Sequence, residues 1–287
     1  MEEKHCAKFF IGDDFVKIID CHIHFRPNFD RFNVVAKSSG HENTREHLEE
    51  VFKRNNIQHA VVMSNFDLDL DNHIYPDFLS YCVGLDSNVF DDRPLDYFVN
   101  LVEKHLQRDN CVGIKLYPGY CHYHIYDEIY TPFYELARKF NKPVAIHTGA
   151  VASSKQGSLL KYSHPLGLDQ VAVKYHDVQF VMCHFGNPWL CDAAVVAEKN
   201  KNVIIDLSGI LEGNFNVGEF LETSKTYVDM LKMWLNYVGD YDRVMYGTDW
   251  PVVNIDSYLE FVKEIIPNKY HEKVFYENAK RVYGLKI

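Results

Sequence analysis

Short runs of apolar and β-branched residues alternate along this chain with longer segments in which apolar residues recur three or four positions apart. Such short runs are typical of buried strands, whereas the wider spacing is typical of helices with one apolar face. The short runs predict eight strands: Lys17–Phe25, Gln58–Asn65, Leu79–Leu85, Val112–Pro118, Pro143–Thr148, Gln179–Phe185, Asn202–Ser208 and Arg243–Thr248. The wider spacing predicts helices that include Thr44–Asn55, Leu95–Gln107, Asp127–Phe140, Val217–Tyr237 and Ser257–Ile265.

This alternation of strands and helices predicts an α/β fold with a parallel sheet built from repeated βα units. Eight such units in 287 residues fit one (β/α)8 barrel, or TIM barrel, a fold of roughly 250 residues or more. We therefore expect a single domain over residues 1–287. An open, doubly wound sheet is the alternative fold. It is disfavoured because no glycine-rich phosphate loop follows the first predicted strand.

Composition excludes several classes of partner. The chain has a formal net charge of −10 and no run of Lys or Arg, so it would repel a nucleic-acid backbone or an anionic membrane. No stretch reaches the ~20 apolar residues that a membrane-spanning helix needs. We therefore expect a small molecule as the partner, and neither nucleic acid nor membrane.

The first residues and the cysteines predict the cellular compartment. Residues 1–8 carry two acidic and two basic side chains with no long apolar stretch behind them, unlike a secretory signal or a transit peptide. The seven cysteines are odd in number, and Cys21, Cys82, Cys111 and Cys183 lie in apolar runs without a paired short spacing. A cytoplasmic protein with reduced cysteines is the expectation.

Two histidines, His22 and His24, stand one residue apart at the end of the first predicted strand. In a strand this spacing places both rings on one face, toward the barrel mouth, with Cys21 and Ile23 on the opposite face against the helices. Two imidazoles placed in this way can share one metal ion. The alternative is a pair of polar side chains at a strand end, with no ligand.

Three further strands end in a residue of the metal-ligand type: His147 ends the fifth, His184 the sixth, and Asp249 follows the eighth. Taken singly, either histidine is more often structural, and Asp249 can be a helix cap. In a parallel barrel, however, all these strand ends meet on the face where barrel enzymes have their active sites. Because five such residues are unlikely to meet by accident, the sequence predicts a metal-dependent active site.

Beyond these histidines, the segments Gly113–Pro118, Gly247–Pro251 and Asn278–Gly284 carry a resemblance to a known family. The chain resembles the amidohydrolase superfamily, in particular the branch of uncharacterised barrel hydrolases and relatives of aminocarboxymuconate semialdehyde decarboxylase. The resemblance covers nearly the whole chain and is specific to the superfamily rather than to a substrate. It implies a metal-dependent TIM-barrel enzyme.

The resemblance also implies a role for each residue at the strand ends. Four of them would bind the metal: His22, His24, His147 and Asp249. The fifth, His184, would assist the chemistry or bind a second ion. A mixed set of nitrogen and oxygen ligands suits Zn²⁺ best, although Mn²⁺, Fe²⁺ or Co²⁺ can occupy the same kind of site.

Lys115, in the fourth predicted strand, leaves the number of ions open. In binuclear members of the superfamily a carbamylated lysine at this position bridges two metals, and here His147 and His184 would then hold the second ion. As a free ammonium group, Lys115 would instead pair with a substrate carboxylate. A structural ion pair is the third alternative. One bound ion is our preferred prediction.

The expected chemistry is hydrolysis, because a zinc-class ion can lower the pKa of a bound water from 15.7 to about 7. Our hypothesis is that Asp249 takes the proton of this water and delivers it to the leaving group, while His184 stabilises the developing oxyanion. Amides, esters, lactones and cyclic imides are all admissible substrates. Replacing Asp249 with Asn should abolish turnover.

The loops after the strands are predicted to select the substrate. Arg26 directly after the histidine pair, and Tyr117 after the fourth strand, are the predicted substrate-binding residues, which favours a small anionic substrate. The simpler interpretation is that basic loop residues are only solvated. Other residues that can reach the mouth are Arg31, Tyr120, His122, His124, Lys155, Lys161 and Trp250. The segment Tyr120–His124 follows a Pro-Gly turn and is expected to form a rim or lid.

Two other functions stay open at the level of sequence. The same metal can hold a substrate carboxylate while His184 or Asp249 protonates a ring carbon, which would make the protein a nonhydrolytic decarboxylase. A barrel that binds metal without turnover, in a regulatory role, is the alternative from outside the enzymes. A homodimer is expected from the resemblance alone.

Overall fold

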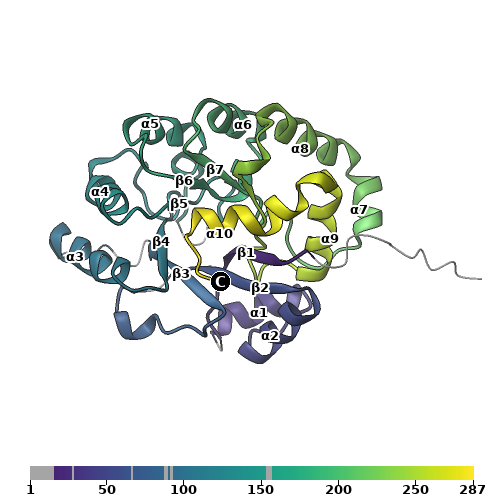
Figure 1. Cartoon of the computed structure of the whole chain (residues 1–287), viewed down its shortest axis with the longest axis horizontal. Coiled ribbons are helices and arrows are strands. Elements are labelled where there is room, and N and C mark those ends of the chain that lie inside the picture. Colours follow the sequence, from purple (N-terminus) through teal and green to yellow (C-terminus); the bar gives the residue numbers. More distant parts are fainter. Residues whose placement is uncertain (1–15, 28, 66, 87–89, 91–92, 153–156) are drawn as a thin grey trace, which may run out of the picture.

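The computed structural model describes residues 16–27, 29–65, 67–86, 90, 93–152 and 157–287. Eight parallel strands of these residues form one sheet in the order of the sequence, surrounded by helices (Figure 1). The strands are β1 (Ile18–Ile23), β2 (Ile57–Met63), β3 (Leu79–Leu85), β4 (Cys111–Leu116), β5 (Val144–Ile146), β6 (Phe180–Met182), β7 (Val203–Asp206) and β8 (Val244–Met245). The predicted (β/α)8 barrel is confirmed.

The ring of strands closes between the two ends of the chain. Strand β8 has only two residues, so the segment that follows it completes the contact with β1. The amide of Asp249 donates to the carbonyl of His22 at 2.8 Å, and the amide of His24 donates to the carbonyl of Trp250 at 2.6 Å. Residues predicted as metal ligands therefore lie on both sides of this closure.

Helices cover the outside of the ring (Figure 1). They are α1 (Asp30–Ser38), α2 (Arg45–Arg54), α3 (Leu95–Leu106), α4 (Thr131–Phe140), α5 (Leu166–Lys174), α6 (Leu190–Lys199), α7 (Val217–Thr223), α8 (Lys225–Val238), α9 (Ile255–Ile265) and α10 (Asn278–Val282). The prediction of one helix over Val217–Tyr237 is wrong, because the chain breaks at Ser224, where φ is −110°. Just before the break, the Thr223 hydroxyl donates to the carbonyl of Glu219 at 2.8 Å, a local bond that can weaken a helix end.

The core has two parts, and alternate residues of each strand contribute to one or the other. In β2, Ala60 and Val62 belong to the larger part, which is shared with the helices, whereas Val61 and Met63 belong to a smaller cluster inside the ring. Residues 279–285 complete this inner cluster from the C-terminal segment. In Figure 1, α10 accordingly crosses the ring of strands, and it contacts β1 and β8.

Strand β1 departs from regular alternation next to the predicted site. The sequence pattern predicts Cys21 on the helix-facing side, but Cys21 belongs to the inner cluster together with Ile19. The cause is an irregular register between β1 and β2, which shifts between Asp20 and Ile23. As a result, the neighbours Cys21 and His22 both lie inside the ring.

Two predictions from composition can be compared with the residues that the structure describes. Among them, no helix joins the length and apolar character that a bilayer crossing requires. The six described cysteines are all free, five of them buried, in agreement with the prediction of reduced thiols.

Candidate active site

Three of the predicted ligands meet at the closure of the barrel. The Nε2 atom of His22 lies 3.2 Å from Oδ1 of Asp249, and the Nε2 atom of His24 lies 3.1 Å from the same oxygen. The His22 side chain is almost fully buried, whereas the side chains of His24 and Asp249 are about 15% exposed. We call His22, His24 and Asp249 the ligand triad.

Both imidazoles of the triad are oriented through their second nitrogen. Nδ1 of His22 lies 2.6 Å from Oδ2 of Asp206, at the end of β7. Nδ1 of His24 lies 2.8 Å from the backbone carbonyl of Met63, at the end of β2. Because both of these partners are acceptors, each Nδ1 carries the proton, which leaves the Nε2 lone pair for a metal ion.

The triad fits a divalent ion. Nε2 of His22 and Oδ1 of Asp249 are buried, yet neither makes a hydrogen bond within the described part of the chain. Buried polar atoms without a partner are costly and call for an explanation. Separations near 3 Å are those of neighbouring ligands around an ion with bonds of about 2.0–2.2 Å. A bound cation would therefore satisfy these atoms.

The charges of the site reinforce one another. Burial opposes ionisation of Asp249, but the neighbouring His22 and His24 outweigh it and hold the pKa of this carboxyl well below its usual range. Burial likewise opposes the charge of Asp206, and His22 nevertheless lowers its pKa to about 2. Two ionised carboxylates therefore face His22, one at each ring nitrogen, and against burial and the nearby Lys115 they hold the pKa of this histidine well above its usual range; a bound cation would take the place of the proton on Nε2.

The backbone around Asp249 is held in an unusual conformation. Asp249 has φ +68°, in the left-handed region that residues with a Cβ rarely adopt. Gly209, in the loop after β7, approaches it closely: a Cβ atom at Gly209 would lie 2.9 Å from Oδ2 of Asp249 and 2.8 Å from Nδ1 of His184. Only glycine leaves room for these two side chains.

His147 and His184 form a second pair beside the triad. Nδ1 of His147 lies 3.1 Å from Nε2 of His184, and the rings of His184 and His22 are 4.9 Å apart. Burial lowers the pKa of His184 to about 4, and burial together with His184 holds the pKa of His147 well below its usual range. Both rings are therefore neutral at pH 7.

The outer nitrogens of this pair face backbone carbonyls. Nε2 of His147 lies 2.9 Å from the carbonyl of Ala150, and Nδ1 of His184 lies 3.0 Å from the carbonyl of Ser208. These contacts take the single N–H of each neutral ring, so the two nitrogens that face each other both carry lone pairs. Such an arrangement is favourable when a proton or a cation lies against them.

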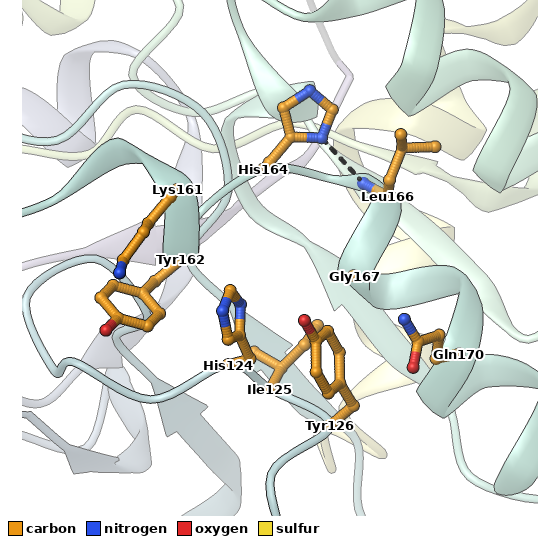
Figure 2. Close-up of a pocket in the computed structure, with 9 residues that line it drawn as sticks. All are labelled: His124, Ile125, Tyr126, Lys161, Tyr162, His164, Leu166, Gly167 and Gln170. Atoms are coloured by element: carbon orange, nitrogen blue, oxygen red, sulfur yellow. Dashed lines mark hydrogen bonds between the residues drawn. The ribbon is translucent and has the colours of Figure 1, made fainter.

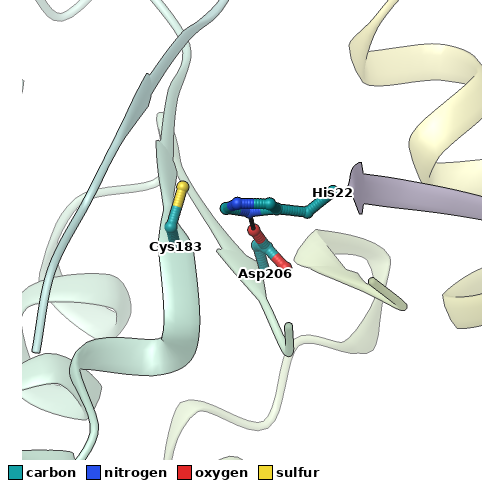
Figure 3. Close-up of side chains that lie close together, drawn as sticks. All are labelled: His22, Cys183 and Asp206. Carbon is teal, nitrogen blue, oxygen red and sulfur yellow. Dashed lines mark hydrogen bonds and ion pairs between the residues drawn. The ribbon is translucent and has the colours of Figure 1, made fainter. Parts of the chain in front are cut away.

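Lys115 is fully buried below the triad, and its Nζ donates to Sγ of Cys183 at 2.9 Å. Figure 3 shows the ring of His22 reaching from the end of β1 toward Cys183 and Asp206. These three residues are a second group with metal-ligand atoms close together. Because the Lys115 ammonium group and the His22–Asp206 contact already engage those atoms, we assign no ion to this group.

The two predicted substrate-binding residues differ in their surroundings. The Tyr117 side chain is buried, and its hydroxyl donates to the carbonyls of Met63 at 3.0 Å and Ser64 at 2.8 Å. Tyr117 thus supports the same carbonyl that orients His24. Arg26 is partly exposed, and its guanidinium carbon lies 3.9 Å from the centre of the Phe29 ring.

The remaining mouth residues are divided between the site and the rim. The ring of Tyr120 lies 5.1 Å from that of His147, so this tyrosine reaches the site. Trp250 does not reach the mouth, since it is fully buried and stacks on Phe25. Lys155 lies outside the described residues.

His124 and Lys161 line a separate cavity of about 210 Å³ between the loops after β4 and β5. Figure 2 shows His124, Tyr126 and Tyr162 on one side of this cavity, with His164 on the opposite side. The rings of His124 and Tyr126 are stacked 4.8 Å apart, at an interplanar angle of 6°. His122 stacks on Tyr162, 5.6 Å away. These loops form part of the barrel rim.

Sequence reasoning missed three residues that shape the site: Asp20, Asp206 and Ser208. Asp206 ends β7, so the rule that selected His147 and His184, a polar residue at a strand end, would also have found Asp206. The Ser208 hydroxyl lies 3.0 Å from Nδ1 of His22. No comparable signal singles out Asp20, which lies within β1.

Comparison with known proteins places these features in a family. The amidohydrolase family model matches residues 19–285, which is nearly the whole chain. No curated protein matches the sequence.

Solved structures of similar fold include the following three. An uncharacterized TIM-barrel protein from Bordetella bronchiseptica has 18% identity and a TM-score of 0.69, with 93% of this chain and 98% of that chain covered. A probable 2-pyrone-4,6-dicarboxylic acid hydrolase from Acinetobacter baumannii has 17% identity and a TM-score of 0.63 (94% and 100% covered). A 5-carboxyvanillate decarboxylase from Novosphingobium aromaticivorans, complexed with manganese, has 13% identity and a TM-score of 0.61 (96% and 97% covered). At these identities the likeness shows the fold.

Proposed function

Because the chain belongs to the amidohydrolase family, we propose that it is a metal-dependent hydrolase that cleaves an amide, ester or lactone bond of a small anionic molecule. The observation that carries this proposal is the ligand triad. Two imidazole nitrogens lie 3.1 and 3.2 Å from one carboxylate oxygen, and both rings are oriented by acceptors behind them. A divalent ion held by the triad supplies a Lewis acid that polarises a substrate oxygen and acidifies water.

Asp249 is the proposed general base and then acid. Its Oδ1 belongs to the triad, while its Oδ2 lies on the side of Gly209 and His184. Oδ2 would accept a proton from the attacking water and return it to the leaving group. His184, within the same small space, is proposed to stabilise the oxyanion that forms on the scissile carbonyl; because its own N–H faces the carbonyl of Ser208, it would do so only with a proton taken up at Nε2.

We propose one ion rather than two, with zinc preferred. A set of two nitrogens and one oxygen suits Zn²⁺, and Mn²⁺, the ion of the similar decarboxylase, is the second candidate. The Nζ atom of Lys115 lies 2.9 Å from Sγ of Cys183, a contact that supports a role for this lysine other than bridging two metals. Metal binding by His147 stays a prediction, supported by the lone pair that its Nδ1 turns toward His184.

The substrate class rests on charge and on the similar enzymes. Arg26, two residues beyond His24 and partly exposed, is the proposed partner of a substrate carboxylate. The printed names of the similar enzymes describe a pyrone dicarboxylic acid hydrolase and a decarboxylase of carboxyvanillate. Both names describe small carboxylated rings, which is the class we propose for this chain.

Decarboxylation is the second candidate, and the manganese-bound decarboxylase is the observation that favours it. The same triad would hold the carboxylate to be lost, and Asp249 or His184 would protonate the ring carbon. The two candidates differ in their products: hydrolysis consumes water and releases no CO₂.

Metal content and turnover together test the proposal. The protein is purified without added metal, its metal content is measured by plasma mass spectrometry, and a panel of lactones, esters, amides and carboxylated phenols is assayed for acid and for CO₂. We expect about one equivalent of metal, lost in the double variant His22→Ala/His24→Ala. Asp249→Asn should lower turnover by about 10²–10⁴-fold, the usual contribution of general acid–base catalysis.

The matched control is His59→Gln. His59 is a buried histidine that lines the surface around Gly284–Ile287 at the other end of the barrel. It should keep both metal and turnover. Wild-type turnover in Asp249→Asn would refute the assigned base. CO₂ release without hydrolysis would favour the decarboxylase, and metal binding without turnover across the panel would favour a binding protein.

A further inference from the structure

We propose that Asp20 is a positioning residue whose buried carboxylate fixes the turn that presents Asp249 to His22 and His24. The inference rests on the metal site proposed above and deepens it. The hydrogen bonds that Asp20 makes within the described residues come from backbone amides and from the Thr248 hydroxyl, not from the imidazoles of the triad, so it acts through Thr248 and the backbone.

The contacts of Asp20 join the two sides of the barrel closure. Oδ1 of Asp20 accepts from the amide of His22 at 3.1 Å and from the amide of Thr248 at 3.0 Å. Oδ2 accepts from the hydroxyl of Thr248 at 2.6 Å. The same hydroxyl oxygen accepts from the amide of Trp250 at 2.9 Å. One carboxylate thus ties β1 to the residues on both sides of Asp249.

The turn at Asp249 needs such support. With φ +68°, Asp249 is in the left-handed region, which residues with a side chain seldom adopt. Conformations of this kind persist where the surroundings impose them. The position of Oδ1, 3.2 Å from Nε2 of His22, depends on this backbone conformation. If the turn relaxes toward a common conformation, the carboxylate leaves the triad.

The burial of Asp20 argues against a role in stability alone. Asp20 is fully buried, and burying a carboxylate has a desolvation cost. An apolar side chain in this strand would avoid that desolvation cost. The hydrogen bonds that Asp20 makes are all to residues that carry or flank the triad, so the geometry points to positioning.

Metal affinity tests the inference with a readout other than activity. Zn²⁺ and Mn²⁺ dissociation constants are measured, by competition with a chromophoric chelator, for metal-free wild type, Asp20→Asn, Thr248→Val and the double variant. We expect each single variant to bind about 10–100-fold more weakly, as is usual when the support of a metal ligand is lost. The double variant should bind metal about as weakly as the weaker-binding single variant, because both substitutions remove the same contact between Asp20 and Thr248.

Thr248→Ser is the matched control, since it keeps the hydroxyl and should bind metal like wild type. Melting temperatures of the metal-free proteins are recorded in parallel. Lower melting temperatures with unchanged metal affinity in Asp20→Asn and Thr248→Val would overturn the inference and leave Asp20 a purely structural residue. Should Asp20→Asn not fold, the comparison of Thr248→Val with Thr248→Ser decides. Absence of metal binding in wild type would instead refute the proposed function, and the inference with it.

Discussion

Gly209 shows how closely the individual residues of this site are fitted together. A methyl group there would lie 2.8 Å from Nδ1 of His184 and 2.9 Å from Oδ2 of Asp249. We therefore predict that Gly209→Ala displaces one or both side chains and lowers kcat by about 10²-fold, the effect expected for a displacement near 1 Å. The measurement is turnover of the substrate found in the panel, together with the melting temperature.

Gly213 provides the control for backbone strain. It too has a positive φ, +76° against +57° for Gly209, but a Cβ atom there would meet nothing within 4 Å. Because both glycines have a positive φ, Gly209→Ala and Gly213→Ala should both lower the melting temperature, but Gly213→Ala should leave kcat unchanged. Equal losses of kcat in both variants would mean that strain in the loop, rather than contact with His184 and Asp249, is responsible.

At the residue scale, the sequence predicted which side chains come together but not which residues support them. His22, His24 and Asp249 were predictable because strand order places their strand ends at one face, and the structure brings them together. The roles of Asp20 and Thr248 depend on hydrogen bonds between residues 228 positions apart, which no local pattern reveals.

Among the elements, α2 and α9 are linked by the ion pair of Arg54 with Asp256 and, beside it, by one neutral histidine, His41. Its Nε2 accepts from the amide of Ile255, the first residue of α9, at 3.1 Å. Its Nδ1 therefore donates to Nε2 of His47, in α2, at 2.9 Å. Burial, reinforced by His47, lowers the pKa of His41 to about 4. Protonation of His41 would remove the acceptor for Ile255.

This pKa predicts a loss of stability in acid. The unfolded chain binds this proton near pH 6.5 and the folded chain only near pH 4, so between these values the unfolded state holds more protons. The contribution of neutral His41 is complete above pH 6.5 and disappears as the pH falls to 4. Its slope is at most about 1.4 kcal/mol per pH unit.

Urea unfolding at pH 7, 5.5 and 4.5 measures the effect in wild type and in His41→Gln. Glutamine offers an acceptor to Ile255 but does not titrate, so the variant should lose less stability on acidification. His59 and His105, whose pKa values are also lowered to about 4 by burial, titrate in both proteins and cancel in the comparison. Identical pH profiles would show that His41 contributes nothing.

The predicted boundaries of the elements are correct where an apolar run ends sharply. They are wrong where polar contacts determine the end of a strand. The limits of β3, Leu79–Leu85, match the prediction, because the whole run is buried. Strands β5 and β6 have only three residues each, since the chain turns toward the site before His147 and His184. The apolar pattern continues through those turns and therefore lengthens the predicted strands.

For the whole molecule, the interior of the ring is completed by the C-terminal segment. Tyr283 is 4% exposed and packs in the inner cluster of residues from the strands. Tyr283→Ala should lower the free energy of unfolding by about 3–5 kcal/mol, the usual cost of removing a large buried ring. Chemical denaturation measures this difference.

Tyr283→Phe separates packing from polarity. The Tyr283 hydroxyl is buried and has no hydrogen-bond partner among the described residues. Its removal should leave stability within about 1 kcal/mol of wild type or raise it, because an unpaired buried hydroxyl is costly. A loss as large as that of Tyr283→Ala would mean that the hydroxyl has a partner and that ring packing is not the main contribution.

The barrel as a whole was predictable because each βα unit has its own local pattern and eight such units fit the length of the chain. The position of α10 could not be predicted in this way. The segment Asn278–Gly284 shows only a short apolar pattern, and its place inside the ring depends partly on residues of β1 and β2, more than 200 positions away in the sequence. Strand β8 has only two residues, so the sequence pattern likewise gives little indication that the ring closes there.

The closure between β1 and the segment after β8 affects how the protein folds during its synthesis on the ribosome. The residues that face each other across it, Asp20 and Thr248, are separated by 228 positions, so β1 must wait for its partner until Thr248 has been translated. Domains are made from the N-terminal end at about 5–20 residues per second. Inner strands can pair during this time, but the ligand set is incomplete until Asp249 has emerged from the ribosome. A nascent chain that ends before Asp249 therefore lacks the proposed ligand set, and the proposed metal site cannot form in it.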